Sequence, residues 1–293
     1  MSNILVTGAN GQLGSELKDV SSRCPNDTFI FTDKDELDIC NHNTVKEFIV
    51  KNNINIIINC AAYTAVDKAE EEFELSNKIN HLAVKNFASI AKEYNIKLIH
   101  VSTDYVFDGR NHVPYQETDK PNPQSVYGVT KLAGENAIQE INPADTIIIR
   151  TSWVYANYGH NFVKTMLHLG NERKELGVIV DQIGTPTYAR DLAKTILEIL
   201  PKIQNENVEV YHYSNEGVCS WYDFAKAIFE IKNIKVKVNA IETFQYPTAA
   251  KRPHYSVLNK SKIKQQFQIE ILNWRDSLID CLKQLNDQKE PNA

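Results

Sequence analysis

A tyrosine and a lysine four residues apart are the side chains of this sequence best suited to chemistry. Tyr127 and Lys131 would share one face of a helix, because positions i and i+4 are neighbours there. A nearby ammonium favours the phenolate, so Lys131 should draw the pKa of Tyr127 down from about 10, towards the range of a proton donor. The spacing alone is weak evidence, since about one such pair is expected by chance among thirteen tyrosines. Tyr222 and Lys226 repeat it, so the surroundings must decide.

Three glycines near the N-terminus predict a nucleotide site. The apolar run Ile4-Leu5-Val6 predicts a buried strand, and a helix is expected from about Gln12. The loop between them carries the glycines in a GxxGxxG pattern, at Gly8, Gly11 and Gly14. Glycine lets backbone N–H groups approach a pyrophosphate, which the helix N-terminus also favours. We therefore expect a dinucleotide-binding protein of the cytoplasm rather than a secreted protein.

An acidic residue after the second predicted strand bears on the choice of dinucleotide. Asp33 lies about twenty residues beyond the glycines, where a carboxylate binds the adenosine ribose hydroxyl of NAD. Lys34 beside it could instead meet the 2′-phosphate of NADP. The sequence therefore leaves NADH and NADPH both open.

The elements that must position these groups alternate between strand and helix over the first 150 residues. Apolar runs around residues 4–6, 29–31, 56–58, 98–101 and 147–149 alternate with helical patterns, including 44–51 and a long charged stretch that reaches about Tyr94. This order predicts an α/β fold of the Rossmann type, with a doubly wound parallel sheet covered on both faces. Functional groups in such folds gather beyond the carboxyl ends of the strands, and Ser102, Thr103 and Asp104 end the fourth run.

The second half is less regular and predicts a smaller α/β substrate-binding lobe. Helices are expected over 162–172 and 191–200, and a strand over 178–180. We expect the dinucleotide-binding domain to span 1–153 with a returning segment of about 188–215. The smaller lobe would take about 154–187 and 216–286, and 287–293 would form a frayed polar tail. Tyr222 follows no strand with a hydroxyl at its end, whereas Thr103 precedes the Tyr127 helix and can bond the tyrosine oxygen and a substrate carbonyl.

Composition excludes several other classes of protein. The net charge of −5 provides no basic surface for nucleic acid, and no apolar run approaches the roughly 20 residues that cross a membrane. Five scattered cysteines without a CxxC pair indicate reduced thiols in the cytoplasm. The eight histidines lack metal-ligand spacing, so no catalytic metal is predicted.

Together these motifs resemble the extended short-chain dehydrogenase/reductase superfamily and, within it, the dTDP-4-dehydrorhamnose reductase family. The similarity covers nearly the whole chain, through residues 59–70, 102–109, 127–135, 150–155, 181–187 and, more loosely, 252–256. It implies reduction by NAD(P)H of the C4 ketone of dTDP-6-deoxy-L-lyxo-4-hexulose to dTDP-L-rhamnose. By this resemblance Tyr127 donates the proton, Lys131 lowers its pKa and binds the cofactor, and Thr103 tunes the site.

The resemblance also implies the residues that bind the two ligands. The cofactor would be held by Gly8, Asn10, Gly11, Gln12, Leu13, Gly14, Asp33, Asp38, Ile39, Ala61, Ala62, Tyr63, Tyr127 and Lys131. The dTDP-4-keto-6-deoxy sugar would meet Thr103 and Asp104, pack on Trp153, and offer its diphosphate to Arg252.

Some relatives are dimers joined through magnesium held by glutamates, and here the pattern is incomplete. Glu16 is retained, but Arg190 stands where a second glutamate would be expected. Magnesium is therefore disfavoured, and we expect a monomer or a weak homodimer.

Two alternatives stay open. Sugar-nucleotide dehydratases follow the strand-end threonine with an Asp-Glu pair, whereas Tyr105 follows Asp104 here, which disfavours elimination of water. A non-catalytic NADP-binding subunit, similar to the regulatory subunit of methionine adenosyltransferase, is the other alternative. The intact Thr103, Tyr127 and Lys131 argue against it.

Overall fold

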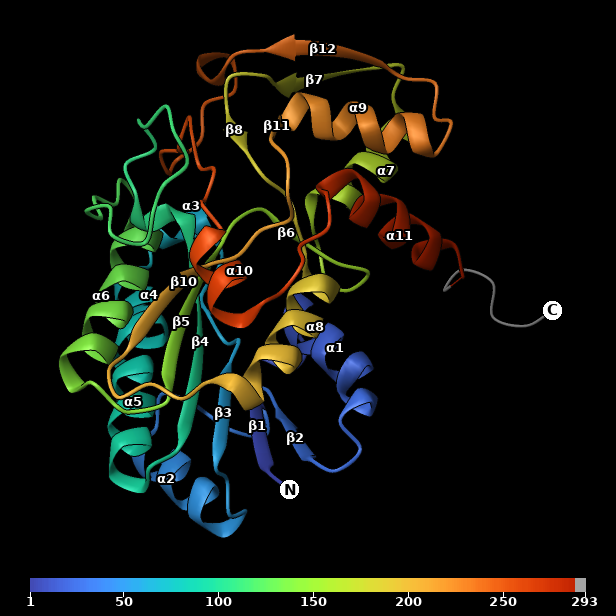
Figure 1. Cartoon of the computed structure of the whole chain (residues 1–293). Coiled ribbons are helices and arrows are strands. Elements are labelled where there is room, and N and C mark those ends of the chain that lie inside the picture. Colours follow the sequence, from blue (N-terminus) through green and yellow to red (C-terminus); the bar gives the residue numbers. More distant parts are fainter. Residues whose placement is uncertain (288–293) are drawn as a thin grey trace.

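The computed structural model describes residues 1–287 and has a six-stranded parallel sheet at its centre (Figure 1). The strand order is β10-β5-β4-β3-β1-β2. The bounds are Asn3–Thr7 for β1, Thr28–Thr32 for β2, Ile56–Asn59 for β3, Lys97–Thr103 for β4, Thr146–Thr151 for β5 and Glu209–His212 for β10. All neighbouring strands run parallel. The predicted parallel sheet is confirmed, and its carboxyl ends share one edge.

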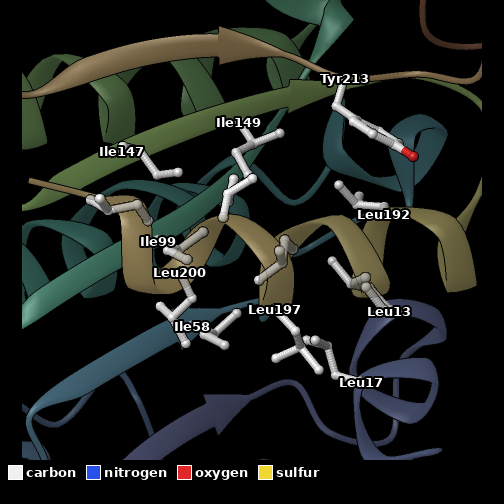
Figure 2. Packing of buried hydrophobic residues seen from close by; sticks show 14 of the residues in the cluster. Leu13, Leu17, Ile58, Ile99, Ile147, Ile149, Leu192, Leu197, Leu200 and Tyr213 are labelled. Atoms are coloured by element: carbon white, nitrogen blue, oxygen red, sulfur yellow. The ribbon is translucent and has the colours of Figure 1, made fainter. Parts of the chain in front are cut away.

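Successive side chains of each strand point to opposite faces of the sheet, so the same apolar runs contribute to two hydrophobic cores. Ile4 and Val6 of β1 join the core under α1 (Gln12–Val20) and α8 (Ala189–Ile199). Leu5 points to the opposite face, under α2 (His42–Lys51), α5 (Ala83–Tyr94) and α6 (Val126–Ile141). Figure 2 shows the first core, where isoleucines of β3, β4 and β5 meet leucines of α1 and α8. Each fully buried aliphatic side chain contributes about 1.5–3 kcal/mol of transfer free energy, so continuous apolar strands require helices on both faces.

A second group of elements packs around aromatic residues above the carboxyl edge of the sheet (Figure 1). Its helices are α7 (Phe162–Glu172), α9 (Trp221–Ile231) and α11 (Trp274–Asp287). Its short strands pair as β7 (Glu175–Ile179) with β12 (Lys237–Ile241), β8 (Ile183–Gly184) with β11 (Cys219–Ser220), and β6 (Val154–Tyr155) with β9 (Thr187–Tyr188). Tyr222 packs against this core, as an ordinary face of an amphipathic helix would.

Most predicted elements are present, but one differs in kind. The helix predicted over 162–172 is confirmed, and the strand expected at 178–180 is β7, displaced towards the N-terminus. The stretch expected as one long helix before Tyr94 is broken into α3 (Val66–Ala69), α4 (Phe73–Asn77), a π-helical turn (Lys78–Leu82) and α5. In that turn, the buried Asn80 amide bonds the backbone N–H and C=O of Tyr63. The π-helical turn therefore holds the loop that follows β3 in place.

The division into two lobes remains a prediction, and one helix lies outside the lobe to which the sequence assigned it. Helix α8 and strand β10 lie in the layers of the large sheet. Helix α10 (Ser261–Phe267), expected in the second lobe, instead adds Ile263 and Phe267 to the core of that sheet, because its apolar side chains cover the edge beside β10. Of the predicted tail, Asp287 ends α11, and 288–293 lie outside the described residues. No helix in residues 1–287 combines the length and apolar character that crossing a membrane demands.

Candidate active site

The glycine loop forms a cradle that only glycine can build. Gly8 has φ +66°, and a Cβ there would lie 2.8 Å from the backbone of Ala61. A Cβ on Gly14 would lie 2.3 Å from the carbonyl oxygen of Gly8. The first turn of α1 is therefore held against the ends of β1 and β3, with backbone N–H groups directed outward. This geometry fits the pyrophosphate of a dinucleotide.

A cavity of about 570 Å³ extends from this cradle along the carboxyl edge of the sheet. Most of the predicted cofactor residues line it, namely Gly8, Gly11, Gln12, Leu13, Asp33, Asp38, Ile39, Ala61, Ala62, Tyr127 and Lys131. Asn10, Gly14 and Tyr63 do not. Gly14 is packed inside the cradle, and the Tyr63 hydroxyl bonds Glu72 on the surface at 2.5 Å.

Asp33 lines this cavity, and backbone hydrogen bonds fix its carboxylate. Its carboxylate accepts the backbone N–H of Asn10 at 2.9 Å and that of Lys34 at 2.8 Å. Asn10 therefore acts by orienting Asp33 rather than by lining the cavity. The side chain keeps lone pairs available for a ribose hydroxyl.

Tyr127 lies at the start of α6, which two side chains cap. Ser125 accepts the N–H of Gly128 at 3.2 Å, and Glu70 accepts that of Val126 at 2.9 Å. Burial raises the pKa of Tyr127 to about 12, against the opposing hydrogen bond with Thr103. The phenol therefore carries its proton throughout the neutral range, as a proton donor must.

Lys131 does not act on Tyr127 as expected. Burial raises the pKa of Tyr127 instead, and the lysine amine is engaged elsewhere. Its Nζ donates to the carbonyl oxygen of Val101 at 2.7 Å and lies 3.4 Å from Nε2 of His100. Burial lowers the pKa of Lys131 itself to about 8, and Glu135 and Cys60 oppose that shift.

Thr103 and Asp104 lie buried at the end of β4, beside Tyr127. The Thr103 hydroxyl donates to Oδ1 of Asp104 at 3.0 Å. Oδ2 of Asp104 is buried and has no well-aligned hydrogen-bond partner within residues 1–287. Burial raises the pKa of Asp104 to about 7. Thr103 and Ser256 oppose this shift by hydrogen bonding to the carboxyl, and neither Thr103 nor Asp104 lines the cavity beside the glycine cradle.

A second cavity of about 560 Å³ lies between the sheet edge and the aromatic lobe. Trp153 and Arg252 both line it, as the sequence predicted, together with Tyr105. The Trp153 ring stacks on Trp221 at 3.6 Å between ring centroids, and the Tyr105 ring meets the edge of Tyr127 at 5.4 Å. Tyr127, which lines the first cavity, thus stands next to the second one.

Arg252 is held by a carboxylate from the other side of the cleft. Its Nη2 donates to Oδ2 of Asp67 at 2.5 Å, and Oδ1 of Asp67 accepts the N–H of Ala250 at 3.0 Å. The guanidinium side chain keeps 21% of its surface exposed. It can therefore still meet an anion in the cavity.

Sequence reasoning missed several lining residues. Gly159 and His160 close the first cavity from the loop after β6, and Arg173 and Gln182 line the second. No spacing distinguished them, because they reach the site only when the lobe packs over the sheet. The positive φ of Gly159, +65°, marks a tight turn that a glycine could have indicated.

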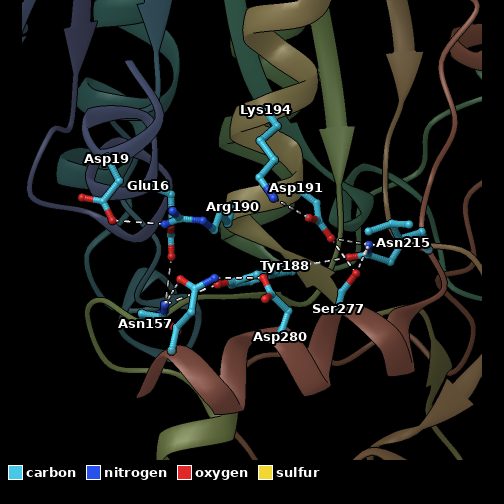
Figure 3. A network of polar contacts seen from close by, with 12 residues as sticks. Glu16, Asp19, Asn157, Tyr188, Arg190, Asp191, Lys194, Asn215, Ser277 and Asp280 are labelled. Atoms are coloured by element: carbon cyan, nitrogen blue, oxygen red, sulfur yellow. Dashed lines mark hydrogen bonds and ion pairs between the residues drawn. The ribbon is translucent and has the colours of Figure 1, made fainter. Parts of the chain in front are cut away.

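Arg190 takes the place expected for a second glutamate and pairs with the first. Its Nη1 donates to Glu16 at 3.0 Å and to Asp19 at 3.2 Å (Figure 3). Burial raises the pKa of Glu16, and Arg190 opposes the shift. Within residues 1–287, no three His, Cys, Asp or Glu side chains converge as metal ligands. A guanidinium thus balances the buried carboxylate.

The glycine cradle, the parallel sheet and the Thr103, Tyr127 and Lys131 constellation define a Rossmann-type protein of the extended short-chain dehydrogenase/reductase class. Dehydratases and an epimerase that share at most 19% identity have this fold as well, with TM-scores of 0.79–0.83.

The sequence profile of the RmlD substrate binding domain matches residues 1–287, and the chain belongs to this family. A dTDP-4-dehydrorhamnose reductase of Aggregatibacter actinomycetemcomitans is 44% identical over 95% of this chain and 97% of its own length. A crystal structure of a dTDP-4-dehydrorhamnose reductase from Clostridium acetobutylicum superposes with a TM-score of 0.92 at 44% identity, covering 97% of this chain and 99% of that one. The Bacillus anthracis reductase in complex with NADP also gives a TM-score of 0.92, at 39% identity over 97% and 99% of the two chains.

Proposed function

We propose that this chain is a dTDP-4-dehydrorhamnose reductase, which reduces the C4 ketone of dTDP-6-deoxy-L-lyxo-4-hexulose to form dTDP-L-rhamnose. The observation that carries the proposal is the position of Tyr127, which lines the dinucleotide cavity and touches Tyr105 of the second cavity. Relatives of that name match nearly the full chain. NADPH or NADH, when bound, supplies the hydride.

The protein side chains bind, orient and protonate. Tyr127 gives its phenolic proton to the ketone oxygen, and the raised pKa keeps that proton in place until the oxygen becomes basic. Thr103 bonds the Tyr127 oxygen, and Asp104, buried beside it, would contact the substrate. Lys131 contributes positive charge beneath the cofactor cavity. Arg252 binds the diphosphate, and Trp153 packs on the sugar.

The residues that follow β2 also fit the adenosine half of the cofactor. Asp33 would accept the ribose hydroxyls of NADH, while Lys34 lines the same cavity and would meet the 2′-phosphate of NADPH. Both cofactors are therefore expected to work. We place the reaction in the cytoplasm, which five unpaired cysteines support, and expect a monomer or weak homodimer without magnesium.

The test is a steady-state assay of NADH and NADPH oxidation with the dTDP-keto sugar. Tyr127→Phe should lose at least about 100-fold in kcat, the scale of general-acid catalysis. Tyr222→Phe is the matched control, since Tyr222 packs in the second lobe, and it should keep normal turnover. Stoichiometric cofactor oxidation separates a reductase from a dehydratase or epimerase, which recycle their NAD. Normal turnover in Tyr127→Phe would remove Tyr127 from the mechanism.

A further inference from the structure

A buried chain of polar side chains runs beneath the cofactor cavity, from the first strand to Lys131. The Thr7 hydroxyl donates to Oδ1 of Asn59 at 2.7 Å, and Nδ2 of Asn59 lies 3.0 Å from Nδ1 of His100. Nε2 of His100 then lies 3.4 Å from Nζ of Lys131. None of these residues exposes more than 1% of its surface. Water therefore has little access to these side chains.

The orientation of the Asn59 amide determines which nitrogen of His100 carries the proton. The backbone N–H of Ala61 also donates to Oδ1 of Asn59, at 3.2 Å. A backbone N–H can only donate, so Oδ1 is the acceptor and Nδ2 is the donor that faces His100. Nδ1 of His100 must accept that hydrogen bond. A neutral imidazole then carries its proton on Nε2, facing Lys131.

The Nε2–H tautomer of His100 interacts differently with the charged and the uncharged form of Lys131. An ammonium has donors only and cannot accept the N–H of His100, whereas an uncharged amine can. His100 stays neutral, because burial and the charge on Lys131 hold its pKa well below its ordinary value. The carboxylate of Glu135, one turn further along α6, is bound by Arg150 at 2.7 Å and Ser102 at 2.5 Å, which limits its help to the ammonium.

We propose that His100, oriented by Asn59, is a positioning residue that weakens the hold of Lys131 on its proton. The groups around the Lys131 amine are His100 and the carbonyl oxygen of Val101 from β4, Cys60 after β3, and Glu135 from α6. Of these, His100 directs an N–H at the amine. The consequence for turnover rests on the proposed function: if that function uses the charged lysine, His100 adds to burial in lowering the upper pH limit of the reductase.

The direct test titrates Lys131 by NMR, using protein labelled with 13C at lysine Cε. The signal is assigned by its loss in Lys131→Met. Its midpoint in the wild type should lie near 8. In His100→Gln the amide oxygen can face the ammonium, so the midpoint should rise by about one unit or more. His168→Gln, a change on the exposed surface of α7, should leave the midpoint unchanged.

A second variant keeps His100 but no longer fixes which of its ring nitrogens carries the proton. In Asn59→Ala nothing obliges Nδ1 to accept, so His100 can present a lone pair to Lys131, and the midpoint should again rise. This variant also serves if His100→Gln does not fold. An unchanged midpoint in the folded variants would overturn the proposal. Because the titration needs no substrate, a shifted midpoint in a protein that does not reduce the keto sugar would refute the proposed function alone. With turnover present, the decline of kcat at high pH should move upward with the midpoint.

Discussion

At the scale of single residues, burial rather than neighbouring charge sets the chemistry of this site. Tyr127, Lys131 and Asp104 are each shifted towards their uncharged forms, with burial as the largest cause. A lysine at i+4 appeared sufficient to lower the pKa of Tyr127. The carbonyl oxygen of Val101 takes that ammonium instead. A spacing can bring two groups to one face, but it cannot tell which partner each will bind.

Asp104 offers a stability test of this burial. Its pKa is about 7 in the folded chain and about 3.9 when unfolded. The folded state therefore binds more protons between these values, and stability falls as pH rises through that window. Asp104→Asn removes this loss. The difference in urea-unfolding free energy between the variant and the wild type should grow in favour of the variant by roughly 2–3 kcal/mol from pH 5 to 7.5. A difference independent of pH would show that Asp104 is not shifted.

At the scale of elements, helices α1 and α8 are joined by apolar contacts and by one buried charge. Leu13 and Leu17 meet Leu192 and Ile196 in the sheet core, and Glu16 lies fully buried beside them. Its carboxylate depends on Arg190 for a counter-charge (Figure 3). The pairing of these two helices therefore depends on an ion pair that neither helical pattern reveals.

Arg190→Ala should destabilise the fold by leaving that carboxylate without its partner. Removing one member of a buried pair costs about 3–5 kcal/mol. Since 22% of the Arg190 side chain is exposed, we expect about 2 kcal/mol in urea unfolding at pH 7. In a Glu16→Gln background the same change should cost less than half as much. Equal costs in both backgrounds would mean that Arg190 acts through Asp19 or packing rather than through Glu16.

At the scale of the whole molecule, the site exists because the aromatic lobe closes over the edge of the sheet. Asp67 of α3 and Arg252 from the loop after β12 meet across the cleft. The second cavity has walls from both parts, with Tyr105 on one side and Trp221 on the other. Substrate binding should therefore depend on residues that neither part positions alone.

Arg252→Ala should weaken binding of the sugar nucleotide more than it slows turnover. Charge-assisted hydrogen bonds contribute about 1.5–3 kcal/mol, so KM for the keto sugar should rise at least tenfold while kcat stays within about threefold. Lys251→Ala, the exposed neighbour, should change neither constant by more than about twofold. An unaltered KM in Arg252→Ala would place the diphosphate elsewhere.

The sequence pattern predicted the structural features that depend on interactions between residues close together in the chain. Apolar runs flanked by helices define the parallel sheet, since its central strands bury both faces. The glycines Gly8 and Gly14 define the cradle, since no other residue fits there. The π-helical turn before α5 and the place of α10 were missed, because a side-chain bond to a distant loop and a sheet edge decide them.

By itself, then, the sequence determined the fold class, the family and the residue types available for reduction of a ketone. Tertiary structure decided the protonation of those residues and their partners: Lys131 on Val101 and His100, Arg252 on Asp67 and Arg190 on Glu16. The physical reason is that pKa values and ion pairs depend on burial and on atoms distant in the chain. Those quantities exist only after elements distant in the sequence have packed together.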